Sequence, residues 1–282
     1  MDILKHKIEI KRTISKYKSA SKTVGFVPTM GTLHQGHISL VEKCNNENDI
    51  TVVSIFVNPT QFNDKKDYNN YPRNIEKDIN ILKNENVDLI FIPSEQEMYP
   101  KPSNIEIFNF GHLDKIMEGK YRKGHFNGVA NIISMLFKIV EPDRAYFGEK
   151  DFQQLVIIRH LVEKIKMKIE IIACPILRES NGLAMSSRNL LLNKEEKKNA
   201  GHISRTLFKV RDMAGKHSVK DVKKWVINEI NKNPFLNVEY FDIVDTSQLS
   251  DIKEWSEAKF LIACIAVKIG KIRLIDNVIF NS

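Results

Sequence analysis

The stretch TVGFVPTMGTLHQGHISLVEKCNNEN, residues 23–48, decides the fold class of this chain. It begins with a short apolar run at Thr23–Val27, typical of a strand that is buried on both faces of a parallel sheet. It ends with helical spacing over Ile38–Asn48. The turn between them therefore joins the carboxyl end of a strand to a helix N-terminus, where free N–H groups and the helix dipole favour a phosphate.

Outward from this stretch, strand-like and helix-like segments alternate over about the first 175 residues. The other strand-like runs are Ile50–Val57, Val87–Ile92 and Ile169–Cys174. The other helical segments are Ile75–Asn84, Val129–Val140 and Phe152–Lys164. This alternation predicts an α/β fold with a Rossmann-like, doubly wound parallel sheet, whose ligand crevice lies at the carboxyl ends of its strands.

The pattern changes after Arg178. Two helical segments are followed by three apolar runs with no helix between them, and only Gly270 and Lys271 separate the last two runs, which predicts a hairpin. The segments are Lys194–Ala214, Val219–Lys232, Val238–Val244, Phe260–Ile269 and Ile272–Ile279. We therefore expect a Rossmann-like domain over residues 1–178 and a smaller C-terminal α+β domain over residues 179–282.

Composition excludes several classes of protein. Of 282 residues, 42% are hydrophobic and 28% charged, as in globular proteins rather than disordered or collagenous chains. The apolar runs are far shorter than the roughly 20 residues of a membrane-crossing helix, and Met1–Lys11 lacks the apolar core of a signal peptide. Three separated cysteines without Cys-x-x-Cys spacing predict reduced thiols. We expect a cytoplasmic protein with no membrane partner.

The net charge of +8 leaves open a polyanionic partner, a phosphorylated substrate or simply a lysine-rich composition. Basic residues are interleaved with acidic ones, as on a solvated helix face, so we expect no nucleic-acid partner. A non-catalytic RNA-binding module is the alternative from another class. It would need a clustered basic face with exposed aromatic residues.

The turn after the first strand carries the chemistry. Gly31 and Gly36 let the backbone approach a ligand closely, while His34 and His37, three residues apart, are able to face the same group. This His-x-Gly-His sequence resembles the signature of class I aminoacyl-tRNA synthetases and related nucleotidyltransferases, which implies ATP binding. Met185-Ser186-Ser187-Arg188 similarly resembles the loop that closes over the triphosphate in those families, and a guanidinium suits phosphate oxygens.

Four further strings narrow the resemblance: FVNPTQF at 56–62, YPR at 71–73, GHFNGV at 124–129 and YFGEKDFQQL at 146–155. With the two phosphate-binding motifs, they make nearly the whole chain resemble the pantoate:β-alanine ligase family, the pantothenate synthetases. The resemblance implies an AMP-forming ligase. Pantoate attacks the α-phosphate of ATP, giving pantoyl adenylate and pyrophosphate, and the amine of β-alanine then displaces AMP.

The resemblance also implies roles for individual residues. His34, His37, Lys150 and Arg188 are the expected catalytic residues, and Gln61, Gln154 and Asn58 the expected pantoate and β-alanine contacts. ATP is expected to contact the residues of three segments and Leu177: Met30, Gly31, Thr32, Leu33, His34, Gln35, Gly36, His37; Gly148, Glu149, Lys150, Asp151; and Met185, Ser186, Ser187, Arg188. His125 is expected to shape the pocket rather than to transfer a proton.

Mg²⁺ is expected to arrive with ATP, held mainly by phosphate oxygens, with Asp78 as a candidate protein contact. Because water would hydrolyse an adenylate, we expect the C-terminal domain to act as a lid, with a hinge near Gly182. The resemblance suggests a homodimer. The nearest alternative function is a nucleotidyltransferase that adenylylates a phosphorylated vitamin precursor, while an aminoacyl-tRNA synthetase is disfavoured because no anticodon-reading domain is evident.

Overall fold

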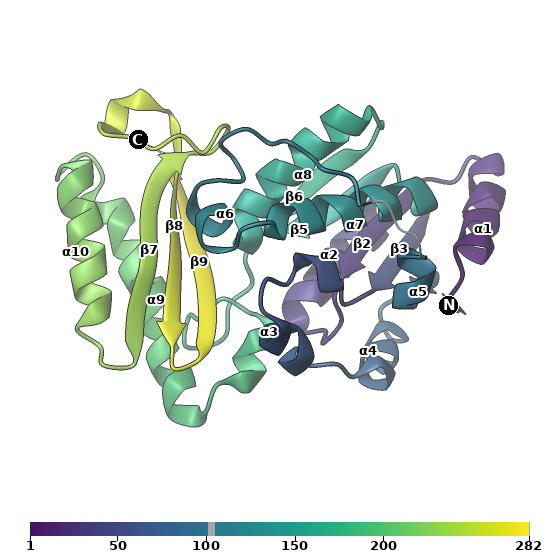
Figure 1. Ribbon diagram of the computed structural model, residues 1–282, viewed down its shortest axis with the longest axis horizontal. Helices are drawn as coiled ribbons and strands as arrows, with labels where there is room; N and C mark the ends of the chain where they lie inside the picture. The colour runs from purple at the N-terminus through teal and green to yellow at the C-terminus, as the bar shows by residue number, and fades with distance from the viewer. Residues whose placement is uncertain (101–104, 282) are drawn as a thin grey trace. The chain divides into compact units, whose positions relative to one another are not determined.

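The computed structural model describes residues 1–100 and 105–281 (Figure 1). The chain divides into two compact units. The first comprises Met1–Glu149 and Gln154–Pro175, and the second comprises Lys150–Gln153 and Ile176–Ser282. The chain thus passes between the units at three places: after Glu149, after Gln153 and after Pro175.

The first unit is built on a six-stranded parallel sheet, ordered β1-β4-β3-β2-β5-β6. The strands are β1 (Asp2–Leu4), β2 (Val24–Thr29), β3 (Ile50–Ile55), β4 (Leu89–Phe91), β5 (Arg144–Gly148) and β6 (Glu170–Cys174). The longer helices are α1 (Lys7–Ser19), α2 (Gln35–Glu47), α4 (Ile75–Leu82), α7 (His125–Val140) and α8 (Phe152–Ile165). Short helical segments are η1 (Pro59–Gln61), α3 (Lys65–Asn70), α5 (Glu95–Met98), α6 (Met117–Tyr121) and η2 (Glu149–Asp151).

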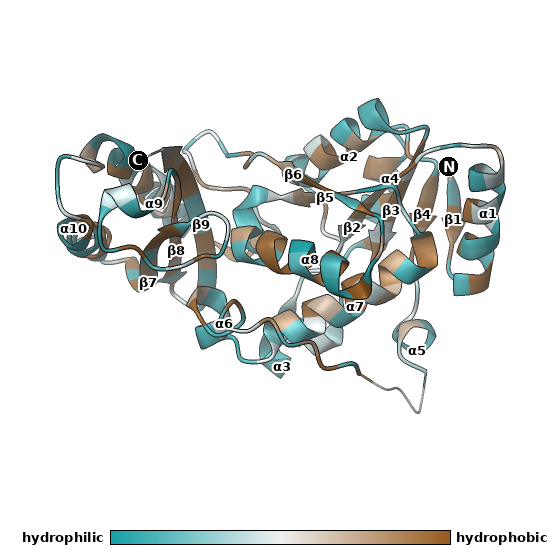
Figure 2. Cartoon of the chain, turned by 90° about the horizontal axis from the view of Figure 1, so that it is seen from above, coloured by the Kyte–Doolittle hydropathy of each residue, from teal (hydrophilic) through white to brown (hydrophobic). Residues whose placement is uncertain are grey.

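Successive residues of each strand point to opposite faces of this sheet, and both faces are buried. Val27 of β2 packs in one apolar cluster with residues of α2 and α4. Its neighbour Phe26 points to the other face, where its ring lies edge-on to Phe137 of α7. Because both faces are covered, the central strands are almost uniformly apolar, which Figure 2 shows as brown strands between helices with teal outer surfaces.

The order of the strands places a switch point beside the turn that follows β2. From β2 the chain continues through α2 to β3 on one side, whereas from β5 it continues through α8 to β6 on the other. The carboxyl ends of the adjacent strands β2 and β5, at Thr29 and Gly148, therefore flank the point where open α/β sheets bind ligands.

The second unit is a three-stranded antiparallel sheet with two helices. Its strands follow the order β7-β8-β9, and their bounds are β7 (Leu236–Asp245), β8 (Phe260–Ile269) and β9 (Ile272–Asn281). Its helical segments are η3 (Ser187–Leu191), α9 (Lys194–Met213), α10 (Val219–Asn231) and η4 (Trp255–Glu257). Helix α9 contacts β8 and β9, and α10 contacts β7. The predicted hairpin between β8 and β9 is confirmed, with Gly270 in the left-handed region that its tight turn requires.

The predicted α/β class with a parallel sheet and a smaller α+β part is confirmed. Sequence patterns missed β1, α1 and β5. Strand β5 contributes only the apolar core Ala145–Phe147 between Arg144 and Gly148, too short a run to stand out. Helix α1 carries charges around most of its surface and buries only Ile10 and Ile14 completely, so its apolar stripe is narrow.

Candidate functional site

The turn after β2 is shaped by contacts within the first unit. The hydroxyl of Thr29 donates to the carbonyl of Ser54 on β3 at 2.8 Å and accepts from the N–H of Gly31 at 3.1 Å. Gly31 has a φ of +77°, and a Cβ there would lie 2.9 Å from Oδ2 of Asp78. Glycine is therefore required at this position by both the backbone conformation and the close approach of a side chain.

Asp78, in the first turn of α4, anchors the same turn. Its Oδ2 accepts from the N–H of Thr32 at 2.8 Å, and its Oδ1 accepts from the N–H of Leu33 at 2.7 Å. The side chain is 2% exposed, and Thr32 has a positive φ of 54° that these bonds help to hold. Both oxygens of the carboxylate that we considered for Mg²⁺ are thus committed to backbone amides.

His34 and His37 cap the helix that they precede and begin. Nδ1 of His34, the N-cap of α2, accepts from the N–H of Gly36 at 3.1 Å, and Nδ1 of His37 accepts from the N–H of His34 at 3.3 Å. The two ring centroids are 4.1 Å apart. A neutral imidazole whose Nδ1 accepts carries its proton on Nε2, so this capping box sets both rings as Nε2–H donors at a helix N-terminus.

A buried amide cluster adjoins this turn. Nε2 of Gln61 contacts Sδ of Met30 at 2.9 Å, and Oε1 of Gln61 accepts from Asn58 at 3.2 Å. Asn58 also donates to the carbonyl of Gly128 on α7 and accepts from the hydroxyl of Tyr99 at 2.7 Å. Since Asn58 is only 1% exposed, its contacts orient Gln61, which is 9% exposed.

Helix α7 supports the same cluster through its first turn. Nδ1 of His125 lies 2.8 Å from the carbonyl of Gln61, and the ring is buried. A Cβ on Gly128 would lie 2.3 Å from the carbonyl oxygen of Thr60, so α7 packs directly on the backbone of η1. His125 thus holds the backbone of Gln61, and its role in shaping a pocket stays a prediction. Gln154 stands in the first turn of α8 and is half-buried.

The second unit holds most of the remaining predicted ATP contacts, while Gly148 and Glu149 belong to the first unit. Nζ of Lys150 pairs with Asp151 at 3.1 Å. A small hairpin formed by residues 177–185 is closed by an N–H of Met185 that donates to the carbonyl of Leu177 at 2.9 Å. The loop Met185–Arg188 follows directly, and Ser186 caps η3 by accepting from the N–H of Arg188 at 3.3 Å.

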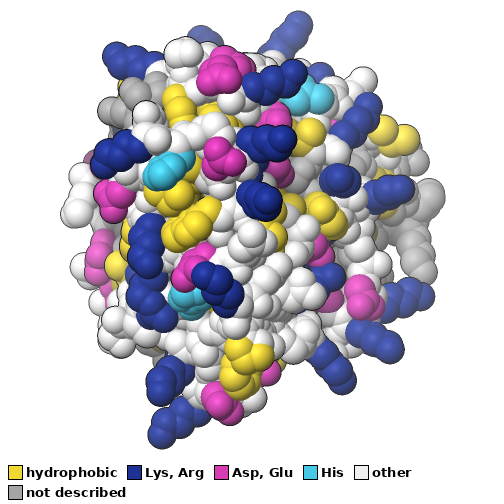
Figure 3. Space-filling model, turned by 90° about the vertical axis from the view of Figure 1, so that its left-hand side faces the viewer, with side chains coloured by type: hydrophobic (Ala, Val, Ile, Leu, Met, Phe, Trp, Pro, Cys, Tyr) yellow, Lys and Arg dark blue, Asp and Glu magenta, His cyan; other side chains and the backbone are white. Residues whose placement is uncertain are grey.

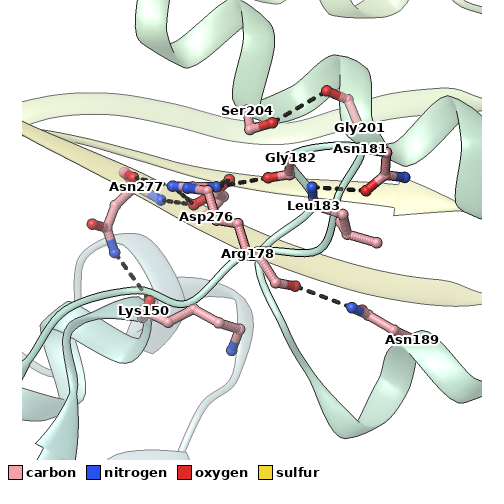
Figure 4. A network of polar contacts seen from close by, with 11 residues as sticks. Lys150, Arg178, Asn181, Gly182, Leu183, Asn189, Gly201, Ser204, Asp276 and Asn277 are labelled. Atoms are coloured by element: carbon pink, nitrogen blue, oxygen red, sulfur yellow. Dashed lines mark hydrogen bonds and ion pairs between the residues drawn. The ribbon is translucent and has the colours of Figure 1, made fainter. Parts of the chain in front are cut away.

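Gly182 lies at the tip of this hairpin and inside the second unit. Its φ is +90°, and a Cβ would meet the hydroxyl oxygen of Ser204 at 2.6 Å (Figure 4). Its carbonyl accepts from the guanidinium of Arg178 at 3.1 Å. Glycine is needed here for the turn and its close packing on α9, and the expected hinge is not at a point where the chain passes between the units.

Sequence reasoning missed the residues that hold the site. Arg178 was noted only as part of a boundary, yet it forms a bidentate ion pair with Asp276 on β9, and the adjacent Asn277 reaches the carbonyl of Lys150 (Figure 4). The available signal was Asp276-Asn277 itself, a polar pair inside the apolar strand sequence Ile272–Phe280. A buried polar pair needs partners, which predicts a network.

Charged side chains are distributed over the surface without a single dominant cluster on the face that Figure 3 draws. On the face drawn in Figure 3, Lys and Arg side chains are scattered among acidic and hydrophobic ones and form no continuous basic patch. Within residues 1–100 and 105–281, no three His, Cys, Asp or Glu side chains are grouped to hold a metal ion. In the same part of the chain, no helix is long and apolar enough to cross a membrane.

Comparisons with known proteins indicate one family. The family model for pantoate-beta-alanine ligase matches residues 2–279. The pantothenate synthetase of Azobacteroides pseudotrichonymphae is 51% identical over 281 residues, covering 99% of this chain and all of the relative. That of Bacteroides thetaiotaomicron is 49% identical over 270 residues, covering 96% of this chain and 95% of the relative.

Solved structures give the same result. The pantothenate synthetase of Thermus thermophilus superposes with a TM-score of 0.92 at 38% identity, over 99% of each chain. The pantoate-beta-alanine ligase of Francisella tularensis, described as complexed with beta-gamma ATP and β-alanine, has a TM-score of 0.81 at 36% identity, over 99% of this chain and 97% of that one. This chain therefore belongs to the pantoate–β-alanine ligase family and is a ligase that joins pantoate to β-alanine.

Proposed function

We propose that the chain condenses (R)-pantoate with β-alanine in two steps at the carboxyl ends of β2 and β5. In the first step a pantoate carboxylate oxygen bonds to the α-phosphorus of ATP and the bond to pyrophosphate breaks. In the second, the β-alanine nitrogen attacks the pantoyl carbonyl carbon, AMP leaves, and the amine loses a proton. Neither step needs a covalent bond to the protein, so donors and cations supply the catalysis.

The capping geometry of His34 and His37 carries this proposal. Because Nδ1 of each ring accepts a backbone N–H, each Nε2 bears a proton that is able to donate to phosphate oxygens. The N-terminus of α2 adds the N–H groups of its first turn and its positive dipole end. Hydrogen bonds within the turn hold these groups in place, so little reorganisation is required when charge develops on the phosphates.

The second unit contributes the cations. Lys150 and Arg188, with the hydroxyls of Ser186 and Ser187, are assigned to the triphosphate, and Asp151 to the ribose hydroxyls. Leu177 and Met185 of the second unit complete the ATP contacts, with Met30–Gln35, Gly36, Gly148 and Glu149 of the first unit. We propose that the second unit acts as a lid, because the adenylate must be kept from water until the amine arrives.

Pantoate is assigned to the amide cluster of the first unit. Gln61 and Gln154 each offer donors and an acceptor, which suits the hydroxyls and carboxylate of pantoate without adding a charge that would compete for ATP. We assign Asn58 to positioning Gln61, because its own polar atoms are engaged with Tyr99, Thr60 and Gly128.

Mg²⁺ belongs to the proposal as a companion of ATP. When bound, it neutralises charge on the phosphates, and it is held by phosphate oxygens and water rather than by a cage of protein carboxylates. The engagement of Asp78 with two backbone amides supports this arrangement. A homodimer is likewise part of the proposal, and light scattering on the purified chain measures it directly.

The test separates the two steps. Purified protein is given magnesium-ATP and pantoate, and pantoate-dependent exchange of pyrophosphate into ATP is measured without β-alanine. AMP release is then measured with β-alanine added. We expect exchange to require pantoate only, and net AMP release to require both substrates. Pyrophosphate exchange at the same rate with and without pantoate would contradict the ligase mechanism. So would AMP that stays covalently bound in the final product.

His34→Asn is the sharpest companion variant. Asparagine is among the best N-cap residues, so the helix start and the melting temperature should be kept, while the Nε2–H donor is lost. A charge-assisted hydrogen bond contributes about 1.5–3 kcal/mol, so the exchange rate should fall roughly ten- to hundredfold. Asn46→Ala, at an exposed position of the same helix that is assigned no ligand contact, is the control and should retain the exchange rate.

A further inference from the structure

An ion pair joins the hairpin that leads into the loop Met185–Arg188 to strand β9, whose next residue contacts the Lys150 turn. Arg178, at the base of the hairpin formed by residues 177–185, donates through Nη1 to Oδ2 of Asp276 at 2.6 Å and through Nη2 to Oδ1 at 2.9 Å. Asp276 is 4% exposed. Two parallel bonds between a planar guanidinium and a carboxylate fix orientation as well as distance.

The guanidinium also determines the shape of the hairpin itself. Beyond Asp276, it donates to the carbonyls of Gly182 at 3.1 Å and Asn277 at 3.3 Å, and it lies 4.9 Å from the ring centroid of Phe208 on α9. The base of the hairpin, its tip, β9 and α9 therefore meet at one side chain (Figure 4). The loop Met185–Arg188 begins where this hairpin ends, so its starting position depends on Arg178.

The next residue on β9 extends the connection to Lys150. Successive residues of a strand point to opposite faces, so Asp276 and Asn277 serve the two sides of β9. The N–H of Asn277 donates to Oδ1 of Asp276 at 2.7 Å, and its Nδ2 donates to the carbonyl of Lys150 at 3.1 Å. The backbone that presents the Lys150 side chain is thus tied to the same strand position that holds Arg178 (Figure 4).

The carboxylate of Asp276 in this network is buried, and burying a charge costs free energy. Burial raises the pKa of Asp276, while the guanidinium of Arg178 acts in the opposite direction. Replacing a buried ion pair by apolar residues of similar volume is often neutral or stabilising, so stability alone does not account for the arrangement. The directional hydrogen bonds of the network instead position the Lys150 turn and the loop Met185–Arg188.

We propose that Arg178, Asp276 and Asn277 are positioning residues, which hold the Lys150 turn and the loop Met185–Arg188 in one frame so that both cations meet the same triphosphate. This inference rests on the proposed function only in taking ATP as the ligand. If the two cations were positioned independently, each of their segments would lose conformational entropy when ATP binds. When one network holds both segments, that entropy has already been lost during folding.

The decisive variant is the double substitution Arg178→Met with Asp276→Leu, which keeps an apolar pair of similar size. We expect the melting temperature to stay near that of the wild type. The KM for ATP in pyrophosphate exchange should rise, and kcat/KM for ATP should fall roughly ten- to hundredfold. The KM for pantoate should be unchanged, because Gln61 and Gln154 belong to the first unit.

Asn277→Ala tests the Lys150 arm alone, since it leaves both groups of the ion pair in place. We expect a smaller loss of the same kind, confined to ATP. The control is Arg273→Met with Glu239→Leu, another ion pair that includes β9, with 2.7 Å between Nε of Arg273 and Oε2 of Glu239. It should leave both KM values unchanged.

Binding of a non-hydrolysable ATP analogue, measured by calorimetry, provides a readout without turnover. If the wild type binds the analogue but shows no pantoate-dependent exchange, the proposed function fails and the positioning role is still decided by the affinities of the variants. A double variant with wild-type stability, affinity and kcat/KM would overturn the inference. If the double variant does not fold, Asn277→Ala decides: weaker analogue binding at unchanged melting temperature supports the inference, and unchanged binding overturns it.

Discussion

Replacement of Asp78 by asparagine tests whether this residue shapes the phosphate-binding turn or holds Mg²⁺. Asparagine has the same shape, but one of its two terminal atoms is a donor and faces an N–H of Thr32 or Leu33 instead of accepting from it. One charge-assisted bond is lost, worth about 1.5–3 kcal/mol, and a buried N–H is left without an acceptor. We expect a total loss of stability of about 3 kcal/mol.

For a domain of this size, such a loss lowers the melting temperature by roughly 6–12 °C, which calorimetry resolves easily. Adenylation measured by pyrophosphate exchange should fall in parallel, because the turn that Asp78 holds presents His34. Glu76→Gln is the matched control, since it removes the same charge from the exposed face of the same helix turn. If Asp78→Asn left the melting temperature unchanged and only raised the Mg²⁺ requirement, the positioning argument would be refuted.

Three further predictions concern other parts of the structure. Gly128→Ala should raise the KM for pantoate at least several-fold in steady-state assays, because the added Cβ would displace η1 and with it Gln61. The pKa of Asp245 is lowered: burial opposes this, but hydrogen bonds from residues 247, 248 and 250 prevail, so the loss of melting temperature in Asp245→Asn should be present at pH 7 and vanish as pH falls below about 4. Burial raises the pKa of Cys44 to about 12 and that of Cys174 to about 11, so a thiol reagent at pH 8 should modify them only at the rate of unfolding, measured by absorbance.

The fold was predictable from sequence wherever one physical signal dominated. Strand β8 was predicted with its observed bounds, Phe260–Ile269, because an apolar run ending at a Gly-Lys turn has few other interpretations. Helix α2 was predicted from residue 38, three residues late. Its first turn carries polar residues that serve as caps, so hydrophobic periodicity cannot detect it.

Some residues of the candidate site could also be predicted from sequence, and others could not. Residues expected to contact ligand stood in recognisable strings, so His34, Gln61 and Lys150 could be named from sequence. The residues that hold them could not be assigned, because their partners are brought close only by strand pairing and helix packing. Asp78 contacts residues 32 and 33, and Asp276 contacts Arg178, across long separations in the chain.

One physical rule connects these holding residues and makes them recognisable in hindsight. Each is a polar side chain placed where the local pattern calls for an apolar one: Asp78 at a buried position of α4, and Asp276 in the alternation Leu274, Asp276, Val278, Phe280 of β9. Burying a carboxylate costs several kcal/mol unless its oxygens are engaged, so each such position requires specific donors nearby. Here the donors are the backbone of one phosphate-binding turn and the guanidinium beside another. The cost of burial is therefore offset only when both loops adopt the conformations seen here, and folding of the chain itself orders the groups that we assign to the phosphates of ATP.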